Sequence, residues 1–123
     1  MYSLAYTAFV SLFVTIAYAQ TPVEPWVAVP QPEVPAIMLK IADCESGGKQ
    51  FYTDGSLVRD GVTGTHVGVY QISLPVWGEK AKELGDDLTT EKGNIDFALR
   101  LYKMYGTAPW LASRDSCWGN NDG

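Results

Sequence analysis

One glutamate in this chain has surroundings that favour acid catalysis. Glu45 lies in the run Cys44-Glu45-Ser46-Gly47-Gly48, which follows an apolar stretch expected to form a helix over residues 36–44. An apolar environment disfavours the charged carboxylate, and the negative pole at a helix C-terminus acts in the same direction, so both raise its pKa. An acid that keeps its proton near neutral pH can protonate the leaving oxygen of a glycosidic bond. The alternative is a solvated residue at a helix end.

Three further motifs follow Glu45 along the chain. They are Gly68-x-x-Gln71-Ile72, Asn94-Ile95 and Trp110-x-x-Ser113-x-x-x-Cys117-Trp118. In their order and spacing, the four motifs resemble those of lysozyme-like domains, in the group of soluble lytic transglycosylases, goose-type lysozymes and resuscitation-promoting factors. The likeness covers residues 36–118. It implies a lysozyme-like fold.

The resemblance also implies an activity. It points to a secreted glycosidase that cleaves the β-1,4 bond between N-acetylmuramic acid and N-acetylglucosamine in peptidoglycan, with no cofactor. Glu45 would be the single general acid and base. In lytic transglycosylases, one glutamate protonates the leaving oxygen and then activates the 6-hydroxyl of muramic acid, which gives a 1,6-anhydro sugar. The alternative is a non-catalytic glycan-binding or interaction module of the same fold.

Substrate contacts are expected from the same motifs and from nearby aromatic residues. Position in the motifs assigns Ser46 and Gln71 to the cleft, with helix termination and backbone pairing as their structural alternatives. Aromatic rings have apolar faces that can stack on sugars, although such residues are more often part of a core. The aromatic candidates are Tyr70, Trp77 and Tyr102.

A hydrolytic mechanism would call for a second carboxylate. Asp54 and Asp60 lie in the expected β flap, but each is next to a glycine, and turn formation explains them better. His66 stands where related domains often carry an acidic residue, which is a departure from the family pattern. Transglycosylase and hydrolase both stay open. Because His66 is the only histidine and no Cys-x-x-Cys pair exists, no metal site is expected.

The N-terminus predicts export. An apolar run over residues 8–17 precedes Ala17-Tyr18-Ala19, which is typical of a signal peptide spanning residues 1–19 and cleaved before Gln20. An uncleaved membrane anchor is the alternative. In an exported chain an even number of cysteines predicts a disulfide, here Cys44 with Cys117, and two free thiols are the alternative. The protein is therefore expected to be secreted or held in the cell envelope.

Composition limits the partners and the number of domains. The formal net charge of −5 leaves no basic patch for nucleic acid, so the expected partner is a peptidoglycan glycan strand. The chain after the signal peptide is long enough for one domain, which we expect to be a monomer. The proline-rich residues 20–35 predict an extended linker, residues 36–118 the catalytic domain, and residues 119–123 a flexible tail.

Local patterns predict an α+β fold that is mostly helical with one small antiparallel β hairpin or flap. After the first helix, the region from Phe51 to Ile72 mixes glycine turns with short β-branched runs and predicts the flap. Further helices are expected from Ser73 to Leu84, from near Thr89 to Gly106, and as a short turn or helix over residues 108–117. The longest helix is expected to bury one face, made of Ile95, Ala98, Leu99, Tyr102 and Tyr105.

Overall fold

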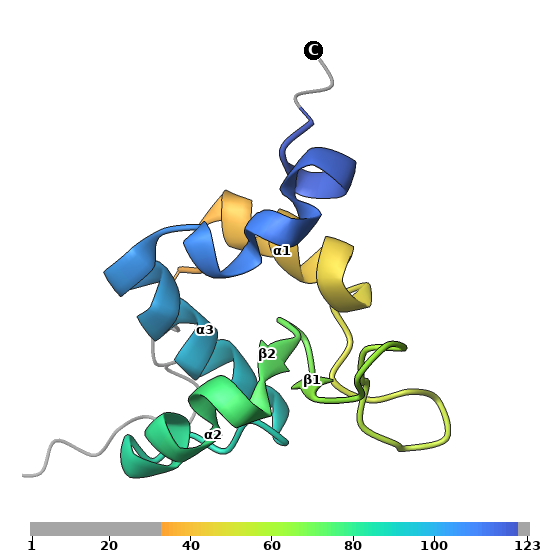
Figure 1. The fold of residues 1–123 in the computed structure, drawn as a ribbon, viewed down its shortest axis with the longest axis vertical. Helices are drawn as coiled ribbons and strands as arrows, with labels where there is room; N and C mark the ends of the chain where they lie inside the picture. The colour runs from red at the N-terminus through yellow and green to blue at the C-terminus, as the bar shows by residue number, and fades with distance from the viewer. Residues whose placement is uncertain (1–32, 121–123) are drawn as a thin grey trace, which may run out of the picture. The chain divides into compact units, whose positions relative to one another are not determined.

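The computed structural model describes residues 33–120, which form helices and one small sheet (Figure 1). The helices are α1 (Ala36–Ser46), α2 (Leu74–Glu83) and α3 (Glu91–Tyr105), followed by the 3₁₀ helix η1 (Ala108–Ser113) and the π-helical turn η2 (Arg114–Trp118). Strands β1 (His66–Val67) and β2 (Ile72–Ser73) pair antiparallel, with His66 opposite Ser73. The α+β prediction is confirmed.

Part of the predicted organisation lies outside the described residues. This holds for the signal peptide over residues 1–19, for most of the linker and for the end of the tail. Within residues 33–120, no helix combines the length and the apolar character needed to cross a bilayer.

The helix ends follow from local sequence chemistry. Gly47 ends α1 in the left-handed conformation, with φ 66°, and its N–H donates to backbone carbonyls of the last turn. Pro75 lies in the first turn of α2, where its missing N–H is no loss. The start of α3 is capped by Thr90, whose hydroxyl accepts the N–H of Gly93 at 3.0 Å. The helix therefore begins at Glu91, two residues after the predicted start near Thr89.

The predicted flap contains less strand than the sequence pattern indicated. Besides β1 and β2, only two isolated bridges connect it, Phe51 with Leu57 and Arg59 with Val67. The chain turns at Asp54-Gly55 within the first bridge and after Asp60 within the second, and at both turns the aspartate side chain binds the backbone. Residues that a longer hairpin would need as strand are therefore part of turns.

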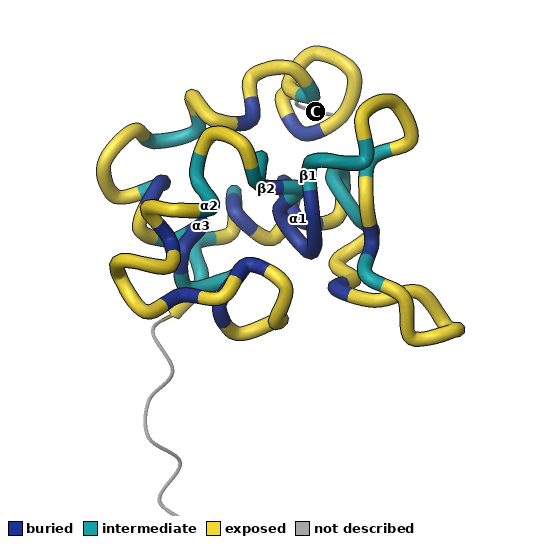
Figure 2. Tube along the Cα trace, turned by 60° about the horizontal axis from the view of Figure 1, so that its bottom comes forward, coloured by how far each residue is buried: buried dark blue, intermediate teal, exposed yellow. Residues whose placement is uncertain are grey.

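The buried face of α3 overlaps only in part with the predicted one. Its buried side chains are those of Asn94, Phe97, Ala98 and Leu101, which follow the helical spacing i, i+3, i+4, i+7 (Figure 2). Ala98 is buried as predicted, Ile95, Leu99 and Tyr102 are half-buried against the core, and Tyr105 is 51% exposed. The predicted face left out the polar Asn94, which is 0% exposed.

Asn94 and Gln50 can be buried because their side-chain amides form hydrogen bonds with backbone groups. Asn94 Oδ1 accepts the N–H of Tyr70 at 3.0 Å, and its Nδ2 donates to the carbonyls of Val67 and Leu88. Gln50 Oε1 accepts the N–H of Val69 at 2.9 Å, and its Nε2 donates to the same Leu88 carbonyl. The two amides thus fasten the loop between β1 and β2 to α3 and to the turn before it.

Gly68 lies directly against these two amides. A Cβ atom at this position would be 2.3 Å from Gln50 Oε1 and 2.4 Å from Asn94 Nδ2, and the backbone φ is +75°. We predict that Gly68→Ala lowers the free energy of unfolding by more than about 2 kcal/mol, because left-handed strain and the clash add together. Urea unfolding checks this.

Gly55→Ala is the matched control, since φ is +85° there and nothing lies within 4 Å of the added Cβ. It should show only the backbone strain, about 1–2 kcal/mol. Equal losses for the two variants would contradict the close approach at Gly68.

The predicted disulfide between Cys44 and Cys117 is present. The two residues are 73 positions apart in sequence, and their Cα atoms are 6.0 Å apart. The bond joins η2, the last helical element, to the last turn of α1. It therefore fixes the C-terminal segment next to Glu45.

Replacing both cysteines by alanine should lower the free energy of unfolding by roughly 2–5 kcal/mol, because the unfolded chain regains the freedom of a long loop. Urea unfolding of the oxidised protein and of the double variant measures the difference. A reducing agent should destabilise the wild type and leave the double variant unchanged. Equal stability of the oxidised and reduced wild type would contradict this prediction.

Candidate active site

Glu45 lies in the last turn of α1 and is half-buried. Burial raises the pKa of its carboxyl, which is the larger effect. Two neighbours oppose it: the hydroxyl of Ser113 donates to Glu45 Oε1 at 2.5 Å, and the charge of His66 also favours the carboxylate. The net pKa is above the ordinary glutamate value, in the direction that the sequence predicts.

Ser46, the residue after Glu45, is bound to the backbone. Its hydroxyl oxygen is 2.7 Å from the carbonyl oxygen of Val69, to which it donates, and it accepts the N–H of Lys49 at 3.0 Å. These bonds tie the end of α1 to the loop between β1 and β2. The contacts of Ser46 match its structural alternative, helix termination, and place it beside Glu45 as a support.

Gln71 lies in the tight turn between the two strands. Its φ of 48° is unusual for a residue with a side chain, and its Nε2 donates to the carbonyl of Gly68 at 2.9 Å. It lines a small cavity of about 70 Å³ together with His66, Ser73 and Trp77. The structure therefore brings Gln71, Trp77 and His66 to one polar cavity.

The three aromatic candidates have different environments. Tyr70 is only 2% exposed, and its ring packs 5.9 Å from that of Trp110, so no face is open to a sugar. Tyr102 is half-buried against the core. Trp77 is half-buried against the core in the same way, with its ring near Phe97 and Tyr105, and it also borders an open hollow of about 360 Å³. The hollow is what distinguishes Trp77 from Tyr102 as a candidate for ligand contact.

Asp54 and Asp60 both organise turns. Asp54 accepts the backbone N–H and the hydroxyl of Ser56, which lower the pKa of its carboxyl. Asp60 accepts the N–H groups of Thr63 and His66 at 2.7 and 2.9 Å, and these bonds hold its pKa far below the usual range. Its Oδ1 is 3.4 Å from His66 Nδ1. Both carboxylates are therefore occupied by their own loops, as the turn interpretation predicts.

Three important side chains were given no role by sequence patterns. Ser113 contacts Glu45 across 68 positions, and no local periodicity indicates so distant a pairing. Gln50 and Asn94 are polar residues, which a hydrophobic pattern assigns to the surface. Asn94 and Ser113 do belong to the four sequence motifs, and motif membership was the one signal in the sequence that could have identified them.

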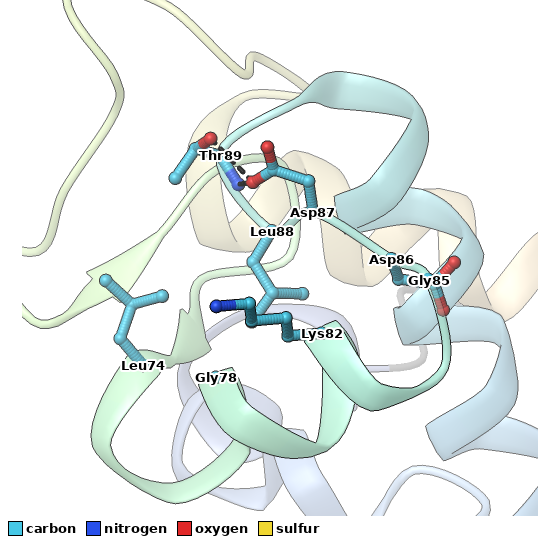
Figure 3. A pocket seen from close by; sticks show the side chains of 8 residues that line it. All are labelled: Leu74, Gly78, Lys82, Gly85, Asp86, Asp87, Leu88 and Thr89. Atoms are coloured by element: carbon cyan, nitrogen blue, oxygen red, sulfur yellow. Dashed lines mark hydrogen bonds between the residues drawn. The ribbon is translucent and has the colours of Figure 1, made fainter.

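A larger hollow lies away from the predicted site residues. A hollow of about 410 Å³ lies between α2 and the loop over residues 85–89 (Figure 3). In Figure 3 the side chains of Leu74, Lys82 and Leu88 border the hollow, and Asp87 accepts the backbone N–H of Thr89. It includes none of the predicted site residues. Cavity volume alone therefore does not point to the predicted site residues.

No known protein family, curated protein or solved structure matches this chain. Among residues 33–120, no group of three or more His, Cys, Asp or Glu side chains could hold a metal ion. Function must therefore be inferred from the contacts of the chain's own residues, above all those of Glu45.

The raised pKa of Glu45 predicts a pH-dependent stability. Because the folded protein prefers the protonated acid, this stabilisation is present below the unfolded pKa and is lost as pH rises through the folded pKa. Glu45→Gln is neutral throughout and should be more stable than wild type at about pH 7, with no such advantage at about pH 3. Thermal unfolding at both pH values measures this.

Glu79→Gln, an exposed position on α2, is the control. It should show a smaller change with pH than Glu45→Gln. An equal change for the two variants would contradict the effect of burial on Glu45.

Proposed function

We propose that this protein cleaves the β-1,4 bond between N-acetylmuramic acid and N-acetylglucosamine in peptidoglycan, with Glu45 as general acid and then general base. The fold that we assign to the domain is lysozyme-like. The observation that carries the proposal is the half-buried carboxyl of Glu45, whose raised pKa favours the protonated form that an acid catalyst needs. The four motifs of the sequence support the same class of enzyme.

The proposed reaction is a transglycosylation. Glu45 gives its proton to the leaving glycosidic oxygen as the bond to C1 of muramic acid breaks. The resulting carboxylate then removes the proton of the muramic acid 6-hydroxyl, and that oxygen forms the new bond to C1. The proton lost from Glu45 is thereby restored, and no water is consumed. This outcome is favoured because Asp54 and Asp60 are held in turns and are not free to activate water.

The proposed substrate contacts are Gln71 and Trp77, which line the same small cavity. An amide can bind the hydroxyl and acetamido groups of a sugar, and an indole ring offers an apolar face. Tyr70 is left out because it is buried, and Ser46 acts through the backbone. The Cys44–Cys117 disulfide supports a location outside the cytoplasm, either secreted or in the cell envelope.

Glu45→Gln should remain folded and lose cleavage of purified peptidoglycan by roughly 10²- to 10⁴-fold, because the amide cannot supply a proton. Asp43→Asn is the matched control, since Asp43 is exposed and lies two residues earlier on the same helix. It should cleave at the wild-type rate. The loss of turbidity of a peptidoglycan suspension measures both.

Mass spectrometry of the soluble products separates the mechanisms. We expect muropeptides with 1,6-anhydro ends. Reducing ends alone would show a hydrolase and would direct attention back to Asp54 and Asp60. Binding of peptidoglycan without cleavage by wild type would overturn the enzymatic proposal in favour of a glycan-binding module.

A further inference from the structure

The hydroxyl of Ser113 lies at the centre of a small hydrogen-bonded group that includes Glu45. Three polar atoms surround Ser113 Oγ: Glu45 Oε1 at 2.5 Å, Trp118 Nε1 at 3.0 Å and the carbonyl oxygen of Trp110 at 3.2 Å. Trp118 is 8% exposed, and Ser113 is half-buried. Ser113 Oγ is therefore held by several partners, one of which is the carboxyl of Glu45.

The chemistry of the three partners sets the direction of each hydrogen bond. The indole N–H of Trp118 can only donate, and it is shared between Ser113 Oγ at 3.0 Å and the carbonyl oxygen of Trp110 at 3.2 Å, so Ser113 Oγ is an acceptor in this contact. The hydroxyl has one proton to give, and the choice is between Glu45 and the carbonyl of Trp110. The carboxyl oxygen is closer by far and is the stronger acceptor when it is charged. The chain of donation therefore runs from Trp118 to Ser113 to Glu45.

We propose that Ser113 is the positioning residue of the general acid, and that it assigns different tasks to the two oxygens of Glu45. Oε1 is held as an acceptor by Ser113, so the catalytic proton resides on Oε2. This inference rests on the proposed function, because it concerns the same carboxyl. Ser113 itself does not exchange a proton with the substrate.

The same contact holds in both protonation states of Glu45. In the acid, Oε1 is the carbonyl oxygen and accepts the Ser113 proton. In the carboxylate, Oε1 still accepts, and the bond becomes charge-assisted and stronger. Glu45 can therefore give up and regain its proton without a change of rotamer, as a residue that serves first as acid and then as base requires.

Covalent structure keeps Ser113 in place. Ser113 ends η1, and the next turn, η2, contains both Trp118 and Cys117. Cys117 is bonded to Cys44, the residue directly before Glu45. The donor segment and the acid are thus joined by a disulfide within a few residues of the hydrogen bond.

The experiment compares Ser113→Ala, Ser113→Thr and Trp118→Phe with the control Ser116→Ala. Ser116 is exposed in η2, and its hydroxyl contacts only the backbone carbonyl of Ser113. Removal of the Ser113 donor should raise the pKa of Glu45, because the hydrogen bond that favours the carboxylate is gone. A carbon-detected NMR titration of the Glu45 carboxyl measures this without turnover, and circular dichroism confirms that each variant is folded.

In the peptidoglycan assay, Ser113→Ala should lower kcat by roughly 10- to 100-fold with little change in KM, because a misplaced acid affects the reacting geometry. The basic limb of its pH profile should move to higher pH. Ser113→Thr should restore both kcat and the profile, Trp118→Phe should fall between, and Ser116→Ala should match wild type.

Ser113→Ala with an unchanged Glu45 titration and an unchanged pH profile would overturn the positioning role. A similar loss in Ser116→Ala would overturn it as well, since the effect would then belong to the whole turn. Wild-type protein that does not cleave peptidoglycan would refute the proposed function, whereas the titration would still decide whether Ser113 holds the carboxyl.

Discussion

The fold depends most on the two buried amides that bind the loop between β1 and β2. Asn94 on α3 and Gln50 after α1 take up backbone N–H and carbonyl groups of residues 67–70 and both bind the carbonyl of Leu88. A sheet of two residues per strand cannot satisfy these groups by itself. Because unpaired polar groups in a core are costly, the amides are what allow so small a sheet to be buried.

The candidate site is supported from the same loop. Val69, whose N–H is bound by Gln50, offers its carbonyl to Ser46 next to Glu45. Tyr70, whose N–H is bound by Asn94, offers its carbonyl to the indole N–H of Trp110 at 2.9 Å. The buried amides therefore position both the helix end that carries Glu45 and the 3₁₀ helix that leads to Ser113. A local hydrogen-bond network links the core to the proposed chemistry.

The sequence predicted the elements well because their signals are local. Pro75, Gly47 and the apolar spacing of α1 indicate helix ends and helix faces within a few residues of themselves. The disulfide could be predicted because only one intramolecular pair exists. The buried face of α3 and the partner of Glu45 could not be predicted in this way, because Asn94 and Ser113 are placed by groups that are distant in sequence. Likewise, the burial of Tyr70 depends on the contact with Trp110, and motif position alone does not show it.

The disulfide between the first and the last helical elements has a consequence for the order of assembly. During synthesis Glu45 emerges long before Ser113 and Trp118, and 68 residues separate the carboxyl from its hydroxyl partner. A nascent chain that has completed only α1, the flap and α2 lacks the hydroxyl of Ser113 that binds the carboxyl and the cysteine that pairs with Cys44. The surroundings of Glu45 are therefore completed only when the last helical segment has been synthesised and has packed on α1.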